Sequence, residues 1–268
     1  MGKFNESNTI EQGLVDLLSS LKNQSWKYYH GDDLPRESHE VIIENWLKKS
    51  LCKLNPDINK DPDKADEVIY KLRGVLIEAD NSGLVSANEL FTEWLRGEKS
   101  MPLGENGEHI TINLIDFSDL SRNDYVLSRQ VPSMGLKNAF FDLVLFINGI
   151  PLIVGEVKTP VRLAISWQDG ASDFMGGEKY YWHNQKKFFV PNLFCFATEG
   201  KTFAYGAINA SFKDWMPWHK TTDGDEIIQS MNKVLSSAED LLNPQTVITL
   251  LKSFSLYSAS RIQKTNLI

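Results

Sequence analysis

Residues 140–160 read FFDLVLFINGIPLIVGEVKTP, and this stretch predicts two apolar strands joined by a tight turn. The turn is Asn148-Gly149, a pair that strongly favours a β-hairpin. Three charged residues interrupt the apolar runs: Asp142 near the start of the first strand, and Glu156 and Lys158 near the end of the second. Glu156 and Lys158 are two apart, so their side chains lie on the same face of the sheet. Burying charge is costly unless the charge is paired or binds a metal, so we expect these three residues to be paired or to bind a metal.

An acid on one strand, followed by an acid-x-lysine pair on the next, is the pattern of the PD-(D/E)xK nucleases. The carboxylates of Asp142 and Glu156 could hold Mg²⁺. Lys158 could orient a water or stabilise the charge that builds on a phosphate. The alternative is structural: Asp142 marks a strand edge, and Glu156 and Lys158 form an exposed ion pair. The spacing alone recurs by chance, but charge at the end of the apolar run 152–155, typical of a buried strand, favours the functional interpretation.

The register of the hairpin decides whether such a site can form. With a strict two-residue turn and regular pairing, Asp142 would face Gly155 and would project away from Glu156. The nuclease hypothesis therefore requires a turn with an odd number of residues or a bulge near Pro151. Pro151 is compatible with a bulge, because it cannot donate a hydrogen bond to the strand ladder.

Composition restricts the classes of protein that fit. The chain has 268 residues, 42% hydrophobic and 24% charged, as in ordinary soluble proteins. No stretch approaches membrane-spanning length and the N-terminus carries no signal sequence, so we expect a cytoplasmic protein without membrane contact. The five histidines and the distant Cys52 and Cys195 form no cluster with zinc-ligand spacing. The net charge of −7 argues against tight DNA binding by the chain alone.

Helical and strand patterns alternate along the chain. Apolar spacing predicts helices at 10–21, 41–54, 66–79 and 88–95, after Pro160, and in two further segments from 225 onward. Strands are predicted at 110–117, 124–131, 192–200 and 203–208, and a loop at 99–107. Glu11 lies at the edge of the first apolar stripe and faces the core; a glutamate that favours the start of a helix would also fit. The order predicts an α/β fold, a mixed sheet flanked by helices.

With these residues in place, the chain resembles the N-terminal nuclease region of the R subunit of type I restriction enzymes. The resemblance rests on FDLVLFINGIPLIVGEVKTP at 141–160 and extends to FVPNLFCFATEGKTFAYGAI at 189–208. It implies a restriction-endonuclease-like mixed sheet with extra N-terminal and C-terminal helices. The nuclease domain would span 1–220, with an inserted helical segment at about 37–97. Residues 221–268 resemble a helical connector toward an ATP-dependent motor.

The resemblance also implies an activity: Mg²⁺-dependent cleavage of double-stranded DNA, as the endonuclease part of a type I restriction enzyme. The partners would be modification and specificity subunits. Asp142, Glu156 and the Val157 carbonyl would hold the metal, and Lys158 would be the catalytic lysine. Glu11 would match an acidic residue that related nucleases place on the first helix.

The chain departs from the family pattern at several positions. Phe140 and Phe141 stand where a basic residue and a proline are frequent. Many members carry Gln-x-x-x-Tyr on the following helix, but here Ser172 stands four residues after Gln168, so we assign the role of neither motif residue to this chain. The GxxxxGK[ST] loop that binds ATP is absent, so ATP would serve only the motor of a full-length subunit, and we expect a fragment. The alternatives are a stand-alone PD-(D/E)xK nuclease and a non-catalytic docking module with the same fold.

Overall fold

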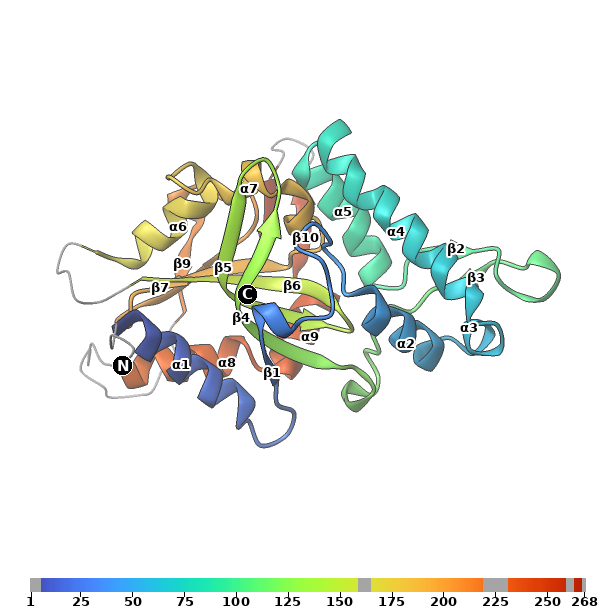
Figure 1. Ribbon diagram of the computed structural model, residues 1–268, viewed down its shortest axis with the longest axis horizontal. Coiled ribbons are helices and arrows are strands. Elements are labelled where there is room, and N and C mark those ends of the chain that lie inside the picture. The colour runs from blue at the N-terminus through green and yellow to red at the C-terminus, as the bar shows by residue number, and fades with distance from the viewer. Residues whose placement is uncertain (1–5, 159–164, 219–230, 259–262, 267–268) are drawn as a thin grey trace.

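A mixed β-sheet forms the centre of the molecule (Figure 1). The computed structural model describes residues 6–158, 165–218, 231–258 and 263–266. Within them, seven strands pair in the order β1-β4-β5-β6-β7-β8-β9. The pairs β1–β4 and β6–β7 are parallel, and the others are antiparallel. The bounds are β1 Lys27–His30, β4 Tyr125–Met134, β5 Asn138–Ile147, β6 Ile150–Val157, β7 Phe194–Thr198, β8 Phe203–Gly206 and β9 Met216–Pro217.

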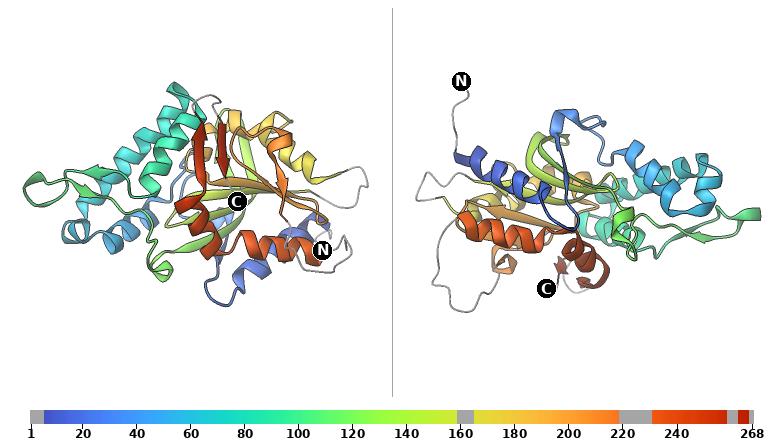
Figure 2. Two further views of the ribbon diagram at one scale, coloured as in Figure 1. Left: turned by 180° about the vertical axis from the view of Figure 1, so that it is seen from behind. Right: turned by 90° about the horizontal axis from the view of Figure 1, so that it is seen from below.

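Helices flank this sheet, which confirms the predicted α/β class. Figures 1 and 2 show that α2 to α5 gather at one end of the molecule. They fall within the interval 37–97 where the sequence predicts an inserted helical segment. The bounds are α1 Glu6–Ser19, α2 Glu44–Leu54, α3 Pro56–Lys60, α4 Asp63–Asn81, α5 Leu84–Leu95, α6 Trp167–Met175, α7 Tyr181–Asn184, α8 Met231–Leu241 and α9 Pro244–Ser253.

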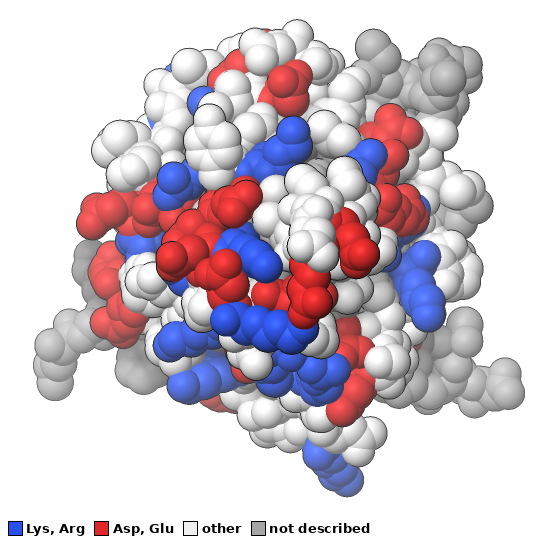
Figure 3. Space-filling view, turned by 90° about the vertical axis from the view of Figure 1, so that its right-hand side faces the viewer, with Lys and Arg blue, Asp and Glu red and all other residues white. Residues whose placement is uncertain are grey.

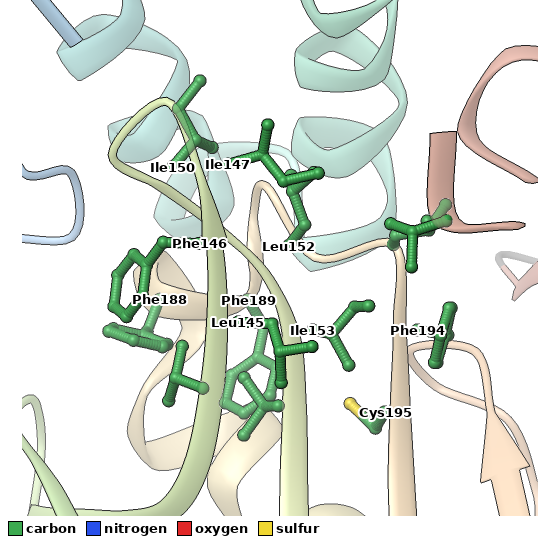
Figure 4. Packing of buried hydrophobic residues seen from close by; sticks show 14 of the residues in the cluster. Leu145, Phe146, Ile147, Ile150, Leu152, Ile153, Phe188, Phe189, Phe194 and Cys195 are labelled. Atoms are coloured by element: carbon green, nitrogen blue, oxygen red, sulfur yellow. The ribbon is translucent and has the colours of Figure 1, made fainter. Parts of the chain in front are cut away.

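Strands β6 and β7 are the most buried part of the sheet. Every residue of β6 is buried, as predicted for a strand covered on both faces. Figure 4 shows its apolar side chains packed toward Phe188 and Phe189 on one side and toward Phe194 and Cys195 on the other. At Gly155 an added Cβ would lie only 2.0 Å from the Phe196 ring, so this close approach of β6 to β7 requires glycine.

The hairpin contains both a tight turn and a bulge. Asn148-Gly149 forms a two-residue turn with positive φ angles of 53° and 82°, the conformation for which this pair is favoured. The pairing of β5 with β6 then shifts by one residue, which leaves Leu152 unpaired beside Pro151. Beyond the shift, the register brings Asp142 opposite Glu156. The predicted bulge near Pro151 is confirmed, and the longer turn is not needed.

Two segments before the hairpin differ from prediction. The predicted strand at 110–117 is wrong beyond Thr111, and the predicted loop at 99–107 contains a short strand: β2 (Ser100–Met101) pairs with β3 (Ile110–Thr111). The backbone N–H of Asn113 donates to the Asn55 side chain (2.8 Å), and that side chain donates to the Asn113 carbonyl (2.9 Å). These bonds to the end of α2 replace the ladder that a strand would need. Strand β1, with its exposed and half-buried residues, was not predicted at all.

The C-terminal segment packs back onto the sheet domain. Asn243 caps α9 through the Gln245 and Thr246 backbone N–H groups, as its place before Pro244 predicts. The Trp26 indole donates to the Leu242 carbonyl (2.8 Å). A two-stranded sheet of β10 (Ser255–Ser258) and β11 (Gln263–Asn266) follows. The predicted helical positions 225–230 and the residues after Pro160 up to 164 lie outside the described residues. Among the described helices, none has the length and apolarity required to cross a membrane.

Candidate functional site

The three charged residues of the hairpin meet at one end of the sheet. The backbone N–H of Val157 donates to Oδ2 of Asp142 (2.8 Å), which ties the two strands together at this point. The Lys158 ammonium donates to Oε1 of Glu156 (2.9 Å). Only 1% of Glu156 is exposed. The structure therefore brings Asp142, Glu156 and Lys158 together, which the regular register would have prevented.

Glu11 approaches from helix α1 and is also buried. The Gln130 side-chain amide lies 3.3 Å from Oδ1 of Asp142 and 3.4 Å from Oε2 of Glu11, so it bridges the two acids. Arg129 lies on the same strand, with its Nε 3.7 Å from Oε2 of Glu11. Gln130 has a left-handed backbone, with φ of 56°, at a cost on the order of 1 kcal/mol. Its carbonyl would lie 2.2 Å from a Cβ at Gly31, so this conformation requires glycine there.

Asp173 and Lys179 complete the site, and sequence reasoning missed both. Asp173 lies on α6, where Gly170 packs closely against Glu156 and β7. The Lys158 ammonium lies 2.5 Å from Asp173, and Lys179 contacts both Glu156 and Asp173. The two lysines and two acids form a closed ring of alternating charge. An acid within the buried face of α6, next to Phe174, is the signal that could have identified Asp173.

Tyr181 packs against the ring of charges and connects it to an aromatic cluster. The Tyr181 hydroxyl donates to Oε2 of Glu156 (3.3 Å), and its ring packs edge-on against Phe141 at 5.0 Å between centroids. The Lys179 ammonium lies 5.4 Å from the Tyr181 ring centroid. Gln168, in contrast, is exposed at the start of α6. Glu156 thus sits in a surrounding of low polarity, where an unpaired charge is costly, whereas the two lysine side chains reach the surface.

Burial and mutual repulsion change the acid–base behaviour of the site. Burial, followed by repulsion from Asp142, raises the pKa of Glu156 to about 8. The same two causes raise the pKa of Glu11 to about 7. Burial would lower the pKa of Lys158, but Glu156 and the hydrogen bond to Asp173 raise it above its usual value. Both lysines stay charged at neutral pH, whereas the two glutamates hold their protons more tightly than in water.

We expect the free energy of unfolding of the chain in EDTA to fall as the pH rises from about 5 to 8. The folded state binds protons at Glu156 and Glu11 more tightly than the unfolded state does. Their contribution to the free energy of unfolding is therefore full at low pH, and it is lost as the pH passes the raised pKa values of about 8 and about 7. Denaturant titrations of the wild type and of Glu156→Gln at several pH values would measure this change in the free energy of unfolding. The variant should show a flatter pH dependence, while the exposed Glu67→Gln should match the wild type. Equal slopes in all three proteins would contradict this assignment.

Asp142 and Glu156 are the carboxylates that could share a cation. Within the described residues, no three His, Cys, Asp or Glu side chains converge as a preformed metal cluster. The possible donors are therefore two carboxylates and the carbonyl of Val157, which lies between Glu156 and Lys158 on the same strand. All are oxygen atoms, which Mg²⁺ and Ca²⁺ prefer.

Comparison with known proteins identifies the family of the chain. Residues 3–214 match the family model of the type I restriction enzyme R protein N terminus. The chain is 25% identical to the type I restriction enzyme HindI endonuclease subunit of Haemophilus influenzae, an alignment covering 96% of the chain and 24% of that protein. It is 26% identical to a protein of Methanocaldococcus jannaschii named as the MjaIXP endonuclease subunit of a type I restriction enzyme, over 84% of the chain and 21% of that protein. The chain spans about a quarter of the length of these curated relatives.

Proposed function

The chain belongs to the family of the type I restriction enzyme R protein N terminus, and from this premise we propose that it is a Mg²⁺-dependent DNA endonuclease domain. It would hydrolyse phosphodiester bonds of double-stranded DNA as part of a restriction-modification enzyme. The observation that supports this most is the bulge at Leu152, which brings Asp142, Glu156 and Lys158 to one end of the sheet. A sheet built for stability alone gains nothing from burying these charges.

The donor set fits a hard divalent cation. The raised pKa values of Glu156 and Glu11 reflect carboxylates that are buried close to Asp142. A bound dication would relieve this repulsion. Asp142 and Glu156 would hold Mg²⁺ together with the Val157 carbonyl. When bound, the ion would supply Lewis acidity toward a phosphate oxygen and stabilise charge on the leaving group.

The other residues orient groups around the reacting phosphate. Lys158 would hold the attacking water. The Lys158 ammonium is itself fixed from two sides, by Glu156 at 2.9 Å and by Asp173 at 2.5 Å. Gln130 holds Asp142 and Glu11 together through its amide. The in-line attack would leave a 5′-phosphate and a 3′-hydroxyl.

The test is a cleavage assay of the chain alone and within the full-length subunit assembled with modification and specificity subunits. We expect Mg²⁺-dependent cleavage of plasmid DNA in the assembly, with ATP required only for the motor. Efficient cleavage by the chain alone would instead indicate a stand-alone nuclease. No cleavage in any assembly, with or without Mg²⁺, would refute the proposal in favour of a docking module.

We expect the isolated chain to bind DNA weakly, with a dissociation constant of roughly micromolar or weaker at physiological salt. Its net charge is −7. Figure 3 shows the end where α2 to α5 lie, and there Lys and Arg side chains are intermingled with Asp and Glu. Lys48 pairs with Asp66 at 2.7 Å, and Arg73 pairs with Glu44 at 2.5 Å. An electrophoretic shift assay measures this affinity, and nanomolar binding by the chain alone would contradict the need for partner subunits.

A further inference from the structure

The second lysine of the charged ring has no role in the proposed chemistry. Lys158 is fixed at the end of β6, where its backbone N–H donates to the Thr198 carbonyl (2.8 Å), and its side chain is 21% exposed. Lys179 lies between α6 and α7, and its side chain is 37% exposed. The more accessible lysine is therefore the one with more freedom to leave the ring.

The Lys179 ammonium contacts two acids of the site. It contacts Glu156 directly, and it lies 3.3 Å from Asp173. Its charge also acts on Asp142 and on Glu11. The Lys179 ammonium thus places a positive charge beside Glu156, where a dication shared by Asp142 and Glu156 would be attracted. The same oxygen of Glu156 cannot serve the ammonium and the dication equally well, because the two cations repel each other.

The backbone around Lys179 is held in place by hydrogen bonds on both sides. On the N-terminal side, the Gly177 N–H donates to the Ser172 carbonyl (2.7 Å) at the end of α6. On the C-terminal side, the Asn184 amide donates to the carbonyl of Lys179 itself (2.6 Å). The backbone that carries the Lys179 side chain is thus fixed, and only the four-carbon side chain has to change conformation for the ammonium to leave Glu156.

We propose that Lys179 is a tethered cation that pairs with Glu156 and Asp173 in the absence of a divalent ion, and that it must leave Glu156 for the ion to bind. This inference rests on the proposed function, because it concerns the same metal site. Lys179 is accordingly a positioning residue that weakens cation binding. It keeps the acids together while no ion is bound, at the cost of affinity for the ion.

The test is a calorimetric titration of the 268-residue chain with Mn²⁺ in the absence of DNA. Lys179→Gln should bind Mn²⁺ on the order of tenfold more tightly than the wild type, because a competing like charge is removed. Lys179→Met, which keeps the packing over Tyr181, should show the same gain. Lys179→Arg, which retains the charge, should bind like the wild type. The matched control is Lys187→Gln, whose ammonium pairs with Asp80 (3.0 Å) outside the ring.

The outcomes separate this inference from the proposed function. Unchanged or weaker Mn²⁺ binding by folded Lys179→Gln and Lys179→Met would overturn the inference and leave the metal site standing. A lysine that only supports the fold would give weaker binding, never tighter. Thermal unfolding of each variant in EDTA shows which proteins are folded. If neither the wild type nor the variants bind Mn²⁺, the metal site is refuted and both proposals fall together.

Discussion

Replacing Asp142 with Asn is expected to lower the rate of DNA cleavage by the assembled restriction enzyme by on the order of a thousandfold or more. Asn lacks the charge of one of the two carboxylates that could share the metal ion. The domain should stay folded, because the amide oxygen of Asn can still accept the hydrogen bond from Val157 that Asp142 accepts at 2.8 Å. A comparable loss is expected for Glu156→Ala and Lys158→Ala, the other two residues of the hairpin site.

Single-turnover cleavage of plasmid DNA measures the loss, and thermal unfolding of each variant shows that the fold persists. Asp33→Asn is the matched control, because Asp33 is exposed in the 3₁₀ turn after β1. It should cleave like the wild type. Wild-type cleavage by a well-folded Asp142→Asn protein would remove Asp142 from the site and with it the proposed mechanism.

Phe141→Ala should lower the free energy of unfolding by about 3–5 kcal/mol, the usual cost of truncating a buried aromatic side chain. Phe141 is completely buried. Its ring centroid lies 5.0 Å from that of Tyr181, 4.5 Å from that of Phe188 and 5.6 Å from that of Phe189. The variant removes the side chain on which several aromatic rings of the site converge. Urea denaturation at neutral pH gives the value.

The neighbouring Phe140 provides a direct comparison, because 57% of it is exposed. Phe140→Ala should change the free energy of unfolding by no more than about 0.5 kcal/mol. Phe140 and Phe141 are consecutive residues of β5 just before Asp142, so the difference between the two variants isolates burial from position in the chain. Similar losses in both would mean that the aromatic cluster does not stabilise the hairpin as its packing indicates.

The hairpin and its charges could be predicted because the signals are local. Asn148-Gly149 specifies the turn by its backbone preference, and the apolar run before Glu156 specifies a buried strand. The bulge could be predicted near Pro151, which cannot donate a hydrogen bond to the ladder, but the unpaired residue itself is identified as Leu152 only by the pairing in the structure. Glu11 was predicted to face the core from helical periodicity, and it is buried there.

The rest of the site depends on contacts between distant segments. Asp173 reaches Lys158 because α6 packs over the end of β6, and Lys179 reaches Glu156 because the chain turns back between α6 and α7. Neither follows from spacing along the chain. The bridging role of Gln130 requires a left-handed residue inside a strand, which no propensity favours.

The pairing of this hairpin also limits how its length can change during descent. Residues alternate between two faces, so one residue inserted into a paired part of either strand between Asp142 and Glu156 would move one acid to the opposite side, whereas two inserted residues would preserve their meeting. Losing Leu152 alone, or gaining one residue in the turn alone, would leave Asp142 opposite Glu156, because neither position is paired across the hairpin. Relatives that keep this chemistry can therefore lengthen the paired segments only in even steps, whereas the turn and the position of Leu152 can change by a single residue.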